Sequence, residues 1–159
     1  KKVNPNVEFG ISPFGVWRNA STDPVKGSST TAGVQNYDDL YADILLWMDK
    51  GWLDYVAPQI YWNQGFKAAE YNTLVKWWSK YAADSGTKLY IGQAAYKVNE
   101  WQNAKELVNQ INFNRNYAQV KGSIFFSYKS LLTNPKNVTN SLKNGPYSSV
   151  PNENIVGMN

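Results

Sequence analysis

Four short apolar segments alternate with four helical patterns along the 159 residues of this chain. The apolar segments are rich in β-branched or aromatic residues and are flanked by turn formers, which predicts strands. These strands cover residues 7–14, 55–62, 89–96 and 122–128. Each segment is almost continuously apolar, a pattern typical of parallel strands that are buried on both faces.

The segments between the strands repeat apolar residues at three- and four-residue spacing, which predicts helices. The expected helices cover residues 36–50, 69–83 and 103–117, with a shorter one over 134–145. Asn36 is the expected N-cap of the first helix, and Gly51 is its expected stop. Asn134 and Pro135 are the expected start of the last helix, and Gly145 is its expected end.

The order of strand and helix, repeated four times, predicts an α/β fold with a parallel sheet and right-handed crossovers. An open doubly wound sheet and part of a (β/α)8 TIM barrel both fit this order. A doubly wound nucleotide-binding sheet usually carries a glycine-rich phosphate loop after its first strand, and the chain has no GxGxxG or Walker-type motif. A complete barrel takes about 250 residues. We therefore expect four consecutive βα units that form half of a barrel.

The composition excludes several kinds of chemistry. The chain has no cysteine and no histidine, so it has no disulfide, no thiolate zinc site and no Ser-His-Asp triad. Its net charge is +4, and Lys1 and Lys2 are the only adjacent cations. Because a nucleic-acid face needs clustered cations beside stacking aromatics, we expect no nucleic-acid partner. No segment approaches the ~20 apolar residues of a membrane span, so we expect no transmembrane helix. We also expect no metal site and no cofactor.

Aromatic rings stand beside amides and single cations where the predicted strands end. In a barrel, functional groups sit at the C-terminal ends of the strands and in the loops that follow them. Because sugar rings stack on aromatic side chains and their hydroxyls pair with amides and charged groups, these residues predict a sugar site. The expected substrate-binding residues are Trp17, Arg18, Gln59, Tyr61, Trp62, Gln93, Tyr96 and Lys97.

Each of these residues also has a purely structural interpretation. Tryptophan and tyrosine side chains near strand ends often fill the mouth of a barrel. Gln59 and Gln93 are amides inside apolar segments, so they either reach a ligand or hydrogen-bond to backbone or to each other. Arg18 either binds a substrate oxygen or pairs with a carboxylate from another strand.

Glycoside hydrolysis usually requires two carboxylates that flank the scissile bond. Most acidic residues of this chain lie in the predicted helices, and Glu8 and Asp54 lie at the opposite end of the strands. Only Asp23 and Glu100 fall in loops on the expected functional face. Glu100 is the candidate for a catalytic role, and a solvated loop charge is the simpler interpretation of it. We expect the main catalytic acids to lie outside this chain.

Five segments carry a family resemblance: FGISPFGVWRN (residues 9–19), YDDLYAD (37–43), GWLDYVAPQIYW (51–62), LYIGQAAYKVN (89–99) and VKGSIFFSYKSL (120–131). They resemble the bacterial glycosyl-hydrolase-like family 10, with a distant likeness to the hydrolase domain of poly-N-acetylglucosamine-processing proteins. The resemblance implies that residues 1–145 form strands five to eight of a (β/α)8 barrel. The family's acidic motif follows strand four, so only the aromatic and amide wall carries over. Residues 146–159 depart from the pattern and are expected to form a polar tail or linker.

The resemblance implies a parent glycoside hydrolase that acts on a bacterial or host polysaccharide, as a periplasmic, secreted or surface lipoprotein. This chain would then supply a substrate-binding wall and half of the scaffold, and it is expected to be inactive alone. The alternative is a non-catalytic carbohydrate-binding or structural module. The expected partners are a polysaccharide or oligosaccharide and the N-terminal half of the barrel. Without that half, we expect the isolated chain to self-associate through its open strand edges and exposed apolar face.

Overall fold

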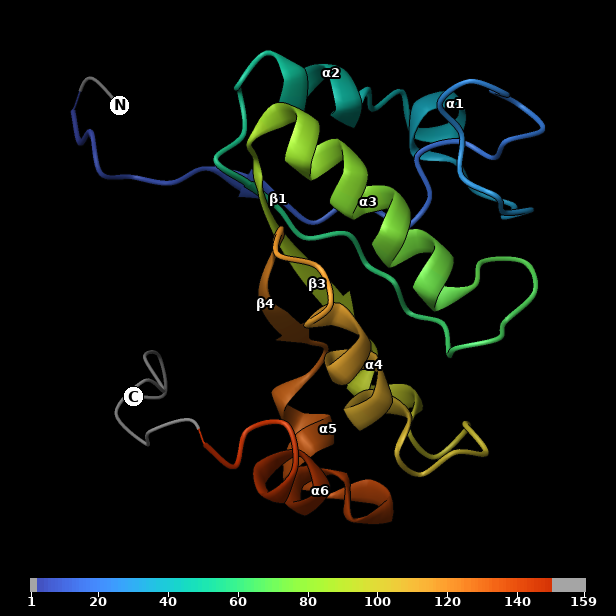
Figure 1. Ribbon diagram of the computed structural model, residues 1–159, viewed down its shortest axis with the longest axis vertical. Helices are drawn as coiled ribbons and strands as arrows, with labels where there is room; N and C mark the ends of the chain where they lie inside the picture. Colours follow the sequence, from blue (N-terminus) through green and yellow to red (C-terminus); the bar gives the residue numbers. More distant parts are fainter. Residues whose placement is uncertain (1–2, 150–159) are drawn as a thin grey trace.

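The computed structural model describes residues 3–149, which form a parallel sheet with helices between its strands (Figure 1). The strands are β1 (Gly10–Ile11), β2 (Tyr55–Val56), β3 (Lys88–Gln93) and β4 (Val120–Phe125). They lie in the order β1-β2-β3-β4, and each is parallel to its neighbour. The predicted α/β alternation with a parallel sheet is confirmed.

The first two strands are shorter than predicted because prolines interrupt their ladders. Proline has no backbone N–H to donate, and Pro13 and Pro58 stand where the pairing of β1 and β2 would continue. The Gln59 N–H still donates to the Pro13 carbonyl at 2.8 Å. Isolated bridges also pair Gln59 with Phe14 and with Gly92. Gln59 therefore lies at the carboxyl end of the sheet, next to segments from both neighbouring strands.

The helices are α1 (Asn36–Leu40), α2 (Ile44–Asp49), α3 (Tyr71–Ser85), α4 (Glu106–Asn114), α5 (Tyr128–Leu132) and α6 (Val138–Asn144). Single 3-10 turns lie at Ala95–Lys97 and Pro135–Asn137. The prediction of one helix over 36–50 is wrong, because this segment forms α1 and α2. Tyr41 ends α1 in a left-handed conformation with φ 54°. The Asp43 side chain then caps α2 by accepting from the Leu46 N–H at 3.2 Å.

The predicted cap of the first helix is displaced by one residue. Gln35 is the N-cap of α1, and the Asn36 side chain donates instead to the carbonyls of Phe14 and Val16, each at 2.7 Å. Asn36 thereby ties α1 to the loop that follows β1. The stop at Gly51 is confirmed, because this residue follows α2 with φ 64°.

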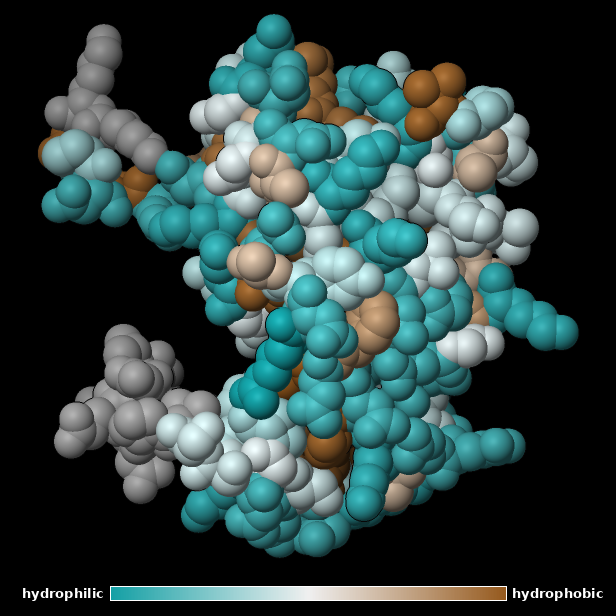
Figure 2. Space-filling model, in the orientation of Figure 1, coloured by the Kyte–Doolittle hydropathy of each residue, from teal (hydrophilic) through white to brown (hydrophobic). Residues whose placement is uncertain are grey.

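The helices α2, α3 and α4 lie on one side of the sheet, and α5 and α6 lie beyond the end of β4 (Figure 1). The larger core cluster joins α2 and α3 to the strands, with Ile44, Leu74, Trp78, Leu89 and Ile91 among its buried members. A second cluster joins α4 to α6. The surface seen in Figure 2 is mostly hydrophilic, with scattered apolar atoms. Among the described residues, no helix is long and apolar enough to cross a membrane.

The other side of the sheet carries exposed apolar side chains. Phe14, Gln59, Gly92 and Ile124 form one row across the four strands, because the bridges and the register pair them in turn. This row points away from the helices, since the neighbouring residue Ile91 packs in the helix-side core. Phe14 and Ile124 are each 47% exposed. Parallel strands with helices on one side are compatible with a sector of a (β/α)8 barrel. The numbering as strands five to eight stays a prediction.

The predicted tail begins in the described part of the chain and ends outside it. Pro146 is buried, and Tyr147 packs against the cluster of α4 and α6. The Tyr147 N–H donates to the Leu142 carbonyl at 3.0 Å. Residues 150–159 lie outside the described residues, so the domain boundary at residue 145 stays a prediction.

Candidate functional site

A cavity of about 470 Å³ opens at the carboxyl ends of β1 and β2. We call it the apolar cavity, because aromatic rings and small side chains make up most of its lining. The polar groups of the lining come mainly from Gln59, Tyr61 and Thr31. Segments after β1 and β2 and the long loop that precedes α1 provide the lining, which includes Phe14, Gly15, Gln59, Tyr61, Trp62, Phe66 and residues 31–34.

Two aromatic rings of the lining stack with nearly parallel planes. The ring centroids of Trp62 and Phe66 are 6.4 Å apart, with 15° between the ring planes. Gly15 makes room for this arrangement, since a Cβ atom at residue 15 would lie 2.8 Å from the Trp62 ring. An aromatic ring at a cavity wall offers an apolar face, which is the surface that the C–H face of a sugar ring packs on.

Gln59 has one half of its amide bound to the protein and the other half directed to the cavity that it lines. Its Nε2 donates to the Ser12 carbonyl at 2.9 Å and lies 3.4 Å from the Ser12 hydroxyl. No hydrogen bond among the described residues reaches its Oε1. The backbone bond foreseen for Gln59 is therefore present, and it fixes the amide so that Oε1 remains as an acceptor at the cavity wall.

Tyr61 links the apolar cavity to a second aromatic group. Its ring centroid lies 6.0 Å from that of Tyr96 and 6.1 Å from that of Phe126. Burial raises the pKa of the Tyr61 hydroxyl, and the nearby Tyr96 raises it further. The Lys97 ammonium lies 5.7 Å from the centre of the Tyr96 ring. Tyr61, Tyr96 and Lys97, three of the predicted site residues, therefore lie together at the ends of β2 and β3.

Gln93 lies on the helix side of the sheet rather than at the cavity. It is fully buried, and its Nε2 donates to the Gln110 Oε1 at 3.1 Å. Gln110 in turn donates to the Glu106 Oε1 at 2.9 Å and to the Trp62 carbonyl at 3.2 Å. Gln93 thus bonds neither to Gln59 nor to backbone through this nitrogen. It begins a buried chain of polar groups that runs along α4 to the segment after β2.

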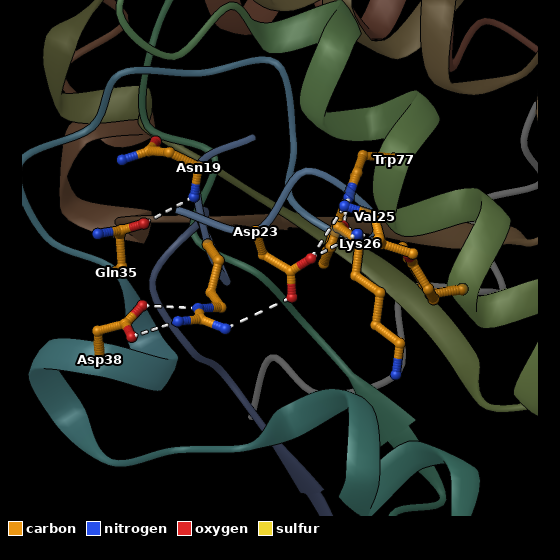
Figure 3. A network of polar contacts seen from close by, with 9 residues as sticks. Asn19, Asp23, Val25, Lys26, Gln35, Asp38 and Trp77 are labelled. Carbon is orange, nitrogen blue, oxygen red and sulfur yellow. Dashed lines mark hydrogen bonds and ion pairs between the residues drawn. The ribbon is translucent and has the colours of Figure 1, made fainter. Parts of the chain in front are cut away.

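Arg18 is held by two carboxylates of the protein, those of Asp38 and Asp23, which Figure 3 labels. Its Nε and Nη2 donate to the two carboxylate oxygens of Asp38 at 2.8 Å and 2.7 Å, and its Nη1 lies 3.4 Å from Asp23. The hydrogen bond to Asp38 raises the pKa of Arg18. Hydrogen bonding from the Lys26 N–H lowers the pKa of Asp23. Of the two interpretations of Arg18, the structure contains the carboxylate pair, although Asp38 belongs to α1 and not to a strand.

Trp17 packs in the core beside Arg18. It is 4% exposed, and its ring lies 5.3 Å from that of Tyr37 and 6.3 Å from that of Trp77. Trp17 and Arg18 line a separate cavity of about 670 Å³ that also borders α2 and α3. The structure therefore does not bring these two predicted residues to the apolar cavity. A substrate contact by either of them stays a prediction.

Glu100 lies in the loop after β3, at a cavity of about 420 Å³ that does not share lining residues with the apolar cavity. Its side chain is exposed, and no hydrogen bond among the described residues reaches it. Glu106, at the start of α4, lines the same cavity and is buried. The catalytic role of Glu100 stays a prediction.

Sequence reasoning missed several residues of this region. Phe66 and residues 31–34 of the loop give no periodic signal, so only the folded chain shows that they line the apolar cavity. Glu106 and Gln110 do carry a signal. They are four residues apart in α4, on the buried side with Leu107 and Ile111, and polar residues in an apolar stripe indicate a buried polar network.

Comparisons with known proteins identify the family of the chain. The family model for glycosyl hydrolase-like 10 matches residues 1–110. Glycosyl hydrolase YngK of Bacillus subtilis (strain 168) is 53% identical over 153 residues, which cover 93% of this chain and 30% of that protein. Glycosyl hydrolase DigH of Escherichia coli (strain K12) is 44% identical over 136 residues, which cover 79% of this chain and 30% of that protein. The chain thus spans about 30% of the length of these curated relatives. It belongs to the glycosyl hydrolase-like 10 family.

Proposed function

We propose that the carboxyl edge of the sheet binds a sugar unit of a polysaccharide or oligosaccharide. The observation that carries this proposal is the pair of near-parallel rings, Trp62 and Phe66, in a cavity whose wall offers the Gln59 Oε1 as an acceptor. The rings would pack on the apolar face of the sugar, and Gln59 would accept a hydrogen bond from one of its hydroxyls. Tyr61 adds a hydroxyl group at the same cavity.

The chain would serve as the substrate-binding wall of a glycoside hydrolase. No carboxylate lines the apolar cavity among the described residues, whereas glycoside hydrolysis usually uses two carboxylates at the scissile bond. We therefore propose that the main acids come from the rest of a longer protein, with this chain as strands five to eight of the barrel. Glu100 is the remaining candidate within this chain. The location outside the cytoplasm belongs to the same proposal and rests on the family resemblance.

A binding experiment tests the sugar site. Trp62→Ala removes half of the ring pair, so we expect it to weaken oligosaccharide binding by about tenfold, measured by calorimetry on the 159-residue chain. Trp52→Ala is the matched control, because Trp52 is 62% exposed and precedes β2, at the opposite end of the strand. Equal losses in both variants, or no binding of any oligosaccharide by the unmodified chain, would falsify the proposal.

A non-catalytic binding module is the second candidate function. The lining of the apolar cavity also favours a binding module. Its polar side chains are an amide and hydroxyls, which can hydrogen-bond to a sugar but do not ordinarily titrate near neutral pH. Turnover separates the two functions. A glycoside hydrolase requires hydrolysis of a glycan once this chain is joined to the rest of the longer protein. A longer protein that binds glycans without hydrolysing any of them would support the module.

A further inference from the structure

The second cavity at this edge, about 420 Å³ in volume, is polar. We call it the Glu106 cavity. Its lining comes from the segment after β2, the loop after β3 and the first residue of α4. It adjoins the apolar cavity along the chain, because Tyr61 and Trp62 line one cavity and the next two residues, Asn63 and Gln64, line the other.

Glu106 has one oxygen bound and one oxygen without a partner. Glu106 as a whole is only 4% exposed. Oε1 accepts from the Gln64 N–H at 2.7 Å and from the Gln110 Nε2 at 2.9 Å. No hydrogen bond or ion pair among the described residues reaches Oε2. Among the described residues, Oε2 is not a fully buried atom, so a donor in the cavity can reach it.

The chain of polar groups along α4 holds this carboxylate in place. Gln110 receives a hydrogen bond from Gln93 at 3.1 Å and bonds to both Glu106 and the Trp62 carbonyl. The network is buried and joins β3, α4 and the segment after β2. Such a network fixes the orientation of its members, so Glu106 keeps its free oxygen at the cavity that it lines.

Two of the four amide side chains in the lining, those of Asn63 and Gln64, direct their donors to the protein, whereas no hydrogen bond among the described residues uses the donors of Gln102 and Asn103. The Asn63 Nδ2 donates to the Gln64 carbonyl at 2.9 Å, and the Gln64 Nε2 donates to the Asn72 Oδ1 at 2.8 Å. No hydrogen bond among the described residues reaches the Asn63 Oδ1 or the Gln64 Oε1. Glu100 adds a second carboxylate to the lining, and no lysine or arginine belongs to it. The cavity therefore offers free amide oxygens and free amide donors, and its two carboxylates give the lining negative charge.

We propose that the Glu106 cavity binds a sugar unit that bears a protonated amine. The ammonium group would donate to the Glu106 Oε2, with Glu100 and the two amide oxygens as further acceptors. A charged donor fits this lining better than a neutral hydroxyl, because its positive charge adds a Coulombic attraction to the two carboxylates that a hydroxyl lacks. The inference rests on the proposed function, since it makes the Glu106 cavity a second subsite of the same glycan.

The test compares two oligosaccharides of equal length, one of glucosamine and one of N-acetylglucosamine, by calorimetry on the 159-residue chain at about pH 6, where amines are protonated. We expect the glucosamine oligomer to bind about tenfold tighter. Glu106→Gln is expected to abolish this preference, and Glu100→Gln to reduce it. Asp49→Asn, which changes an exposed carboxylate of α2, is the matched control and should leave it unchanged. Non-specific electrostatic attraction does not explain such a preference, because the chain carries a net charge of +4 and the glucosamine oligomer is also positively charged.

The outcomes distinguish this inference from the proposed function. Equal affinity for the two oligomers overturns the inference and leaves the sugar site at the apolar cavity intact. Binding of neither oligomer overturns both. If Glu106→Gln fails to fold, carbon-detected NMR of the unmodified chain replaces it. The signal of the Glu106 carboxyl carbon should then shift with the glucosamine oligomer and stay fixed with the acetylated one, and the opposite result contradicts the inference.

Discussion

Gly15 lets two other residues of the apolar cavity, Gln59 and Trp62, approach closely because it has no side chain. A Cβ atom there would lie 2.8 Å from the Gln59 carbonyl oxygen and 2.8 Å from the Trp62 ring, so either backbone or indole must move. We expect Gly15→Ala to lower the free energy of unfolding by about 1–3 kcal/mol, as overpacking does, and to weaken oligosaccharide binding. Urea unfolding and calorimetry measure the two effects.

Gly33→Ala is the matched control for this substitution. Gly33 lines the same cavity, and a Cβ atom at this residue would meet no atom within 4 Å. Its substitution should leave the urea midpoint close to that of the unmodified chain. If Gly15→Ala is as stable as Gly33→Ala, the close contact with Gln59 and Trp62 does not govern the cavity.

The sequence predicted the position of some residues at the carboxyl edge of the sheet and not of others. Gln59, Tyr61 and Trp62 follow one strand directly, so they share a cavity as the strand-end rule predicts. Arg18 and Trp17 also follow a strand, but Asp38 and Tyr37 of α1 hold them in another cavity. That outcome depends on how the long loop folds back, and no periodic pattern encodes it.

At the scale of elements, the break between α1 and α2 places one residue in an unfavourable backbone conformation. Tyr41 is 90% exposed and has φ 54°, a conformation that costs an L-residue with a Cβ about 1–2 kcal/mol. Glycine adopts this conformation without that cost, although it loses more entropy on folding. We therefore expect Tyr41→Gly to raise the free energy of unfolding by about 0.5–1 kcal/mol in urea.

Lys50→Gly controls for the general cost of a glycine. Lys50 is an exposed residue at the end of α2, with φ −78° in the right-handed region. A glycine at residue 50 relieves no left-handed conformation and only adds conformational entropy to the unfolded chain. We therefore expect this variant to be less stable by about 0.5–1 kcal/mol. A loss of stability in Tyr41→Gly of the same size would show that the left-handed conformation costs the chain nothing.

The N-terminus of α3 depends on an ionised cap. The Glu70 Oε2 accepts from the Thr73 N–H at 2.6 Å, and its Oε1 accepts from the Gly65 N–H at 3.3 Å. Burial acts to raise the pKa of Glu70, but the backbone hydrogen bonds outweigh it and lower this pKa. The folded-state pKa therefore lies below the unfolded one. The resulting stability is complete above the unfolded pKa and is lost as the pH falls through the folded pKa.

Glu70→Gln should therefore cost about 0.5 kcal/mol of unfolding free energy near neutral pH, because the carboxylate is partly exposed and screened. The difference from the unmodified chain should vanish in acid, as urea unfolding over a pH series would reveal. Asp84→Asn changes an acid in the last turn of the same helix, where removing negative charge is mildly favourable. A difference for Glu70→Gln that persists in acid would contradict the role of the ionised cap.

Elements with long periodic patterns were predictable, and short ones were not. Residues 69–83 gave α3 to within two residues at each end, because fifteen residues hold several turns of one apolar face. The five residues of α5 hold little more than one turn, and the sequence merged part of them into a strand. The apolar composition of the first two segments predicts strands that are longer than β1 and β2, because composition does not register the missing N–H groups of Pro13 and Pro58.

At the scale of the whole molecule, the two faces of the sheet differ. Helices cover one face, and the other presents the row that includes Phe14 and Ile124, together with Phe126, which is 57% exposed. The sheet also ends at β1 and β4, whose outer edges pair with no described strand. Unpaired edges and contiguous apolar surface both favour association with another chain. The strand order β1-β2-β3-β4 accounts for this asymmetry, because right-handed crossovers between strands added in one direction place successive helices on the same side.

We expect copies of the 159-residue chain to associate through this face. The average mass measured by light scattering should rise with concentration, and Ile124→Lys should return it toward that of the monomer without unfolding the chain, since Ile124 is already half exposed. Leu46→Lys is the matched control, because Leu46 is 40% exposed on α2, on the helix side. It should leave the association unchanged. A single monomeric species at all concentrations would show that neither the open edges of β1 and β4 nor the exposed apolar row causes the chain to associate. The same result from Leu46→Lys and Ile124→Lys would locate the contact elsewhere.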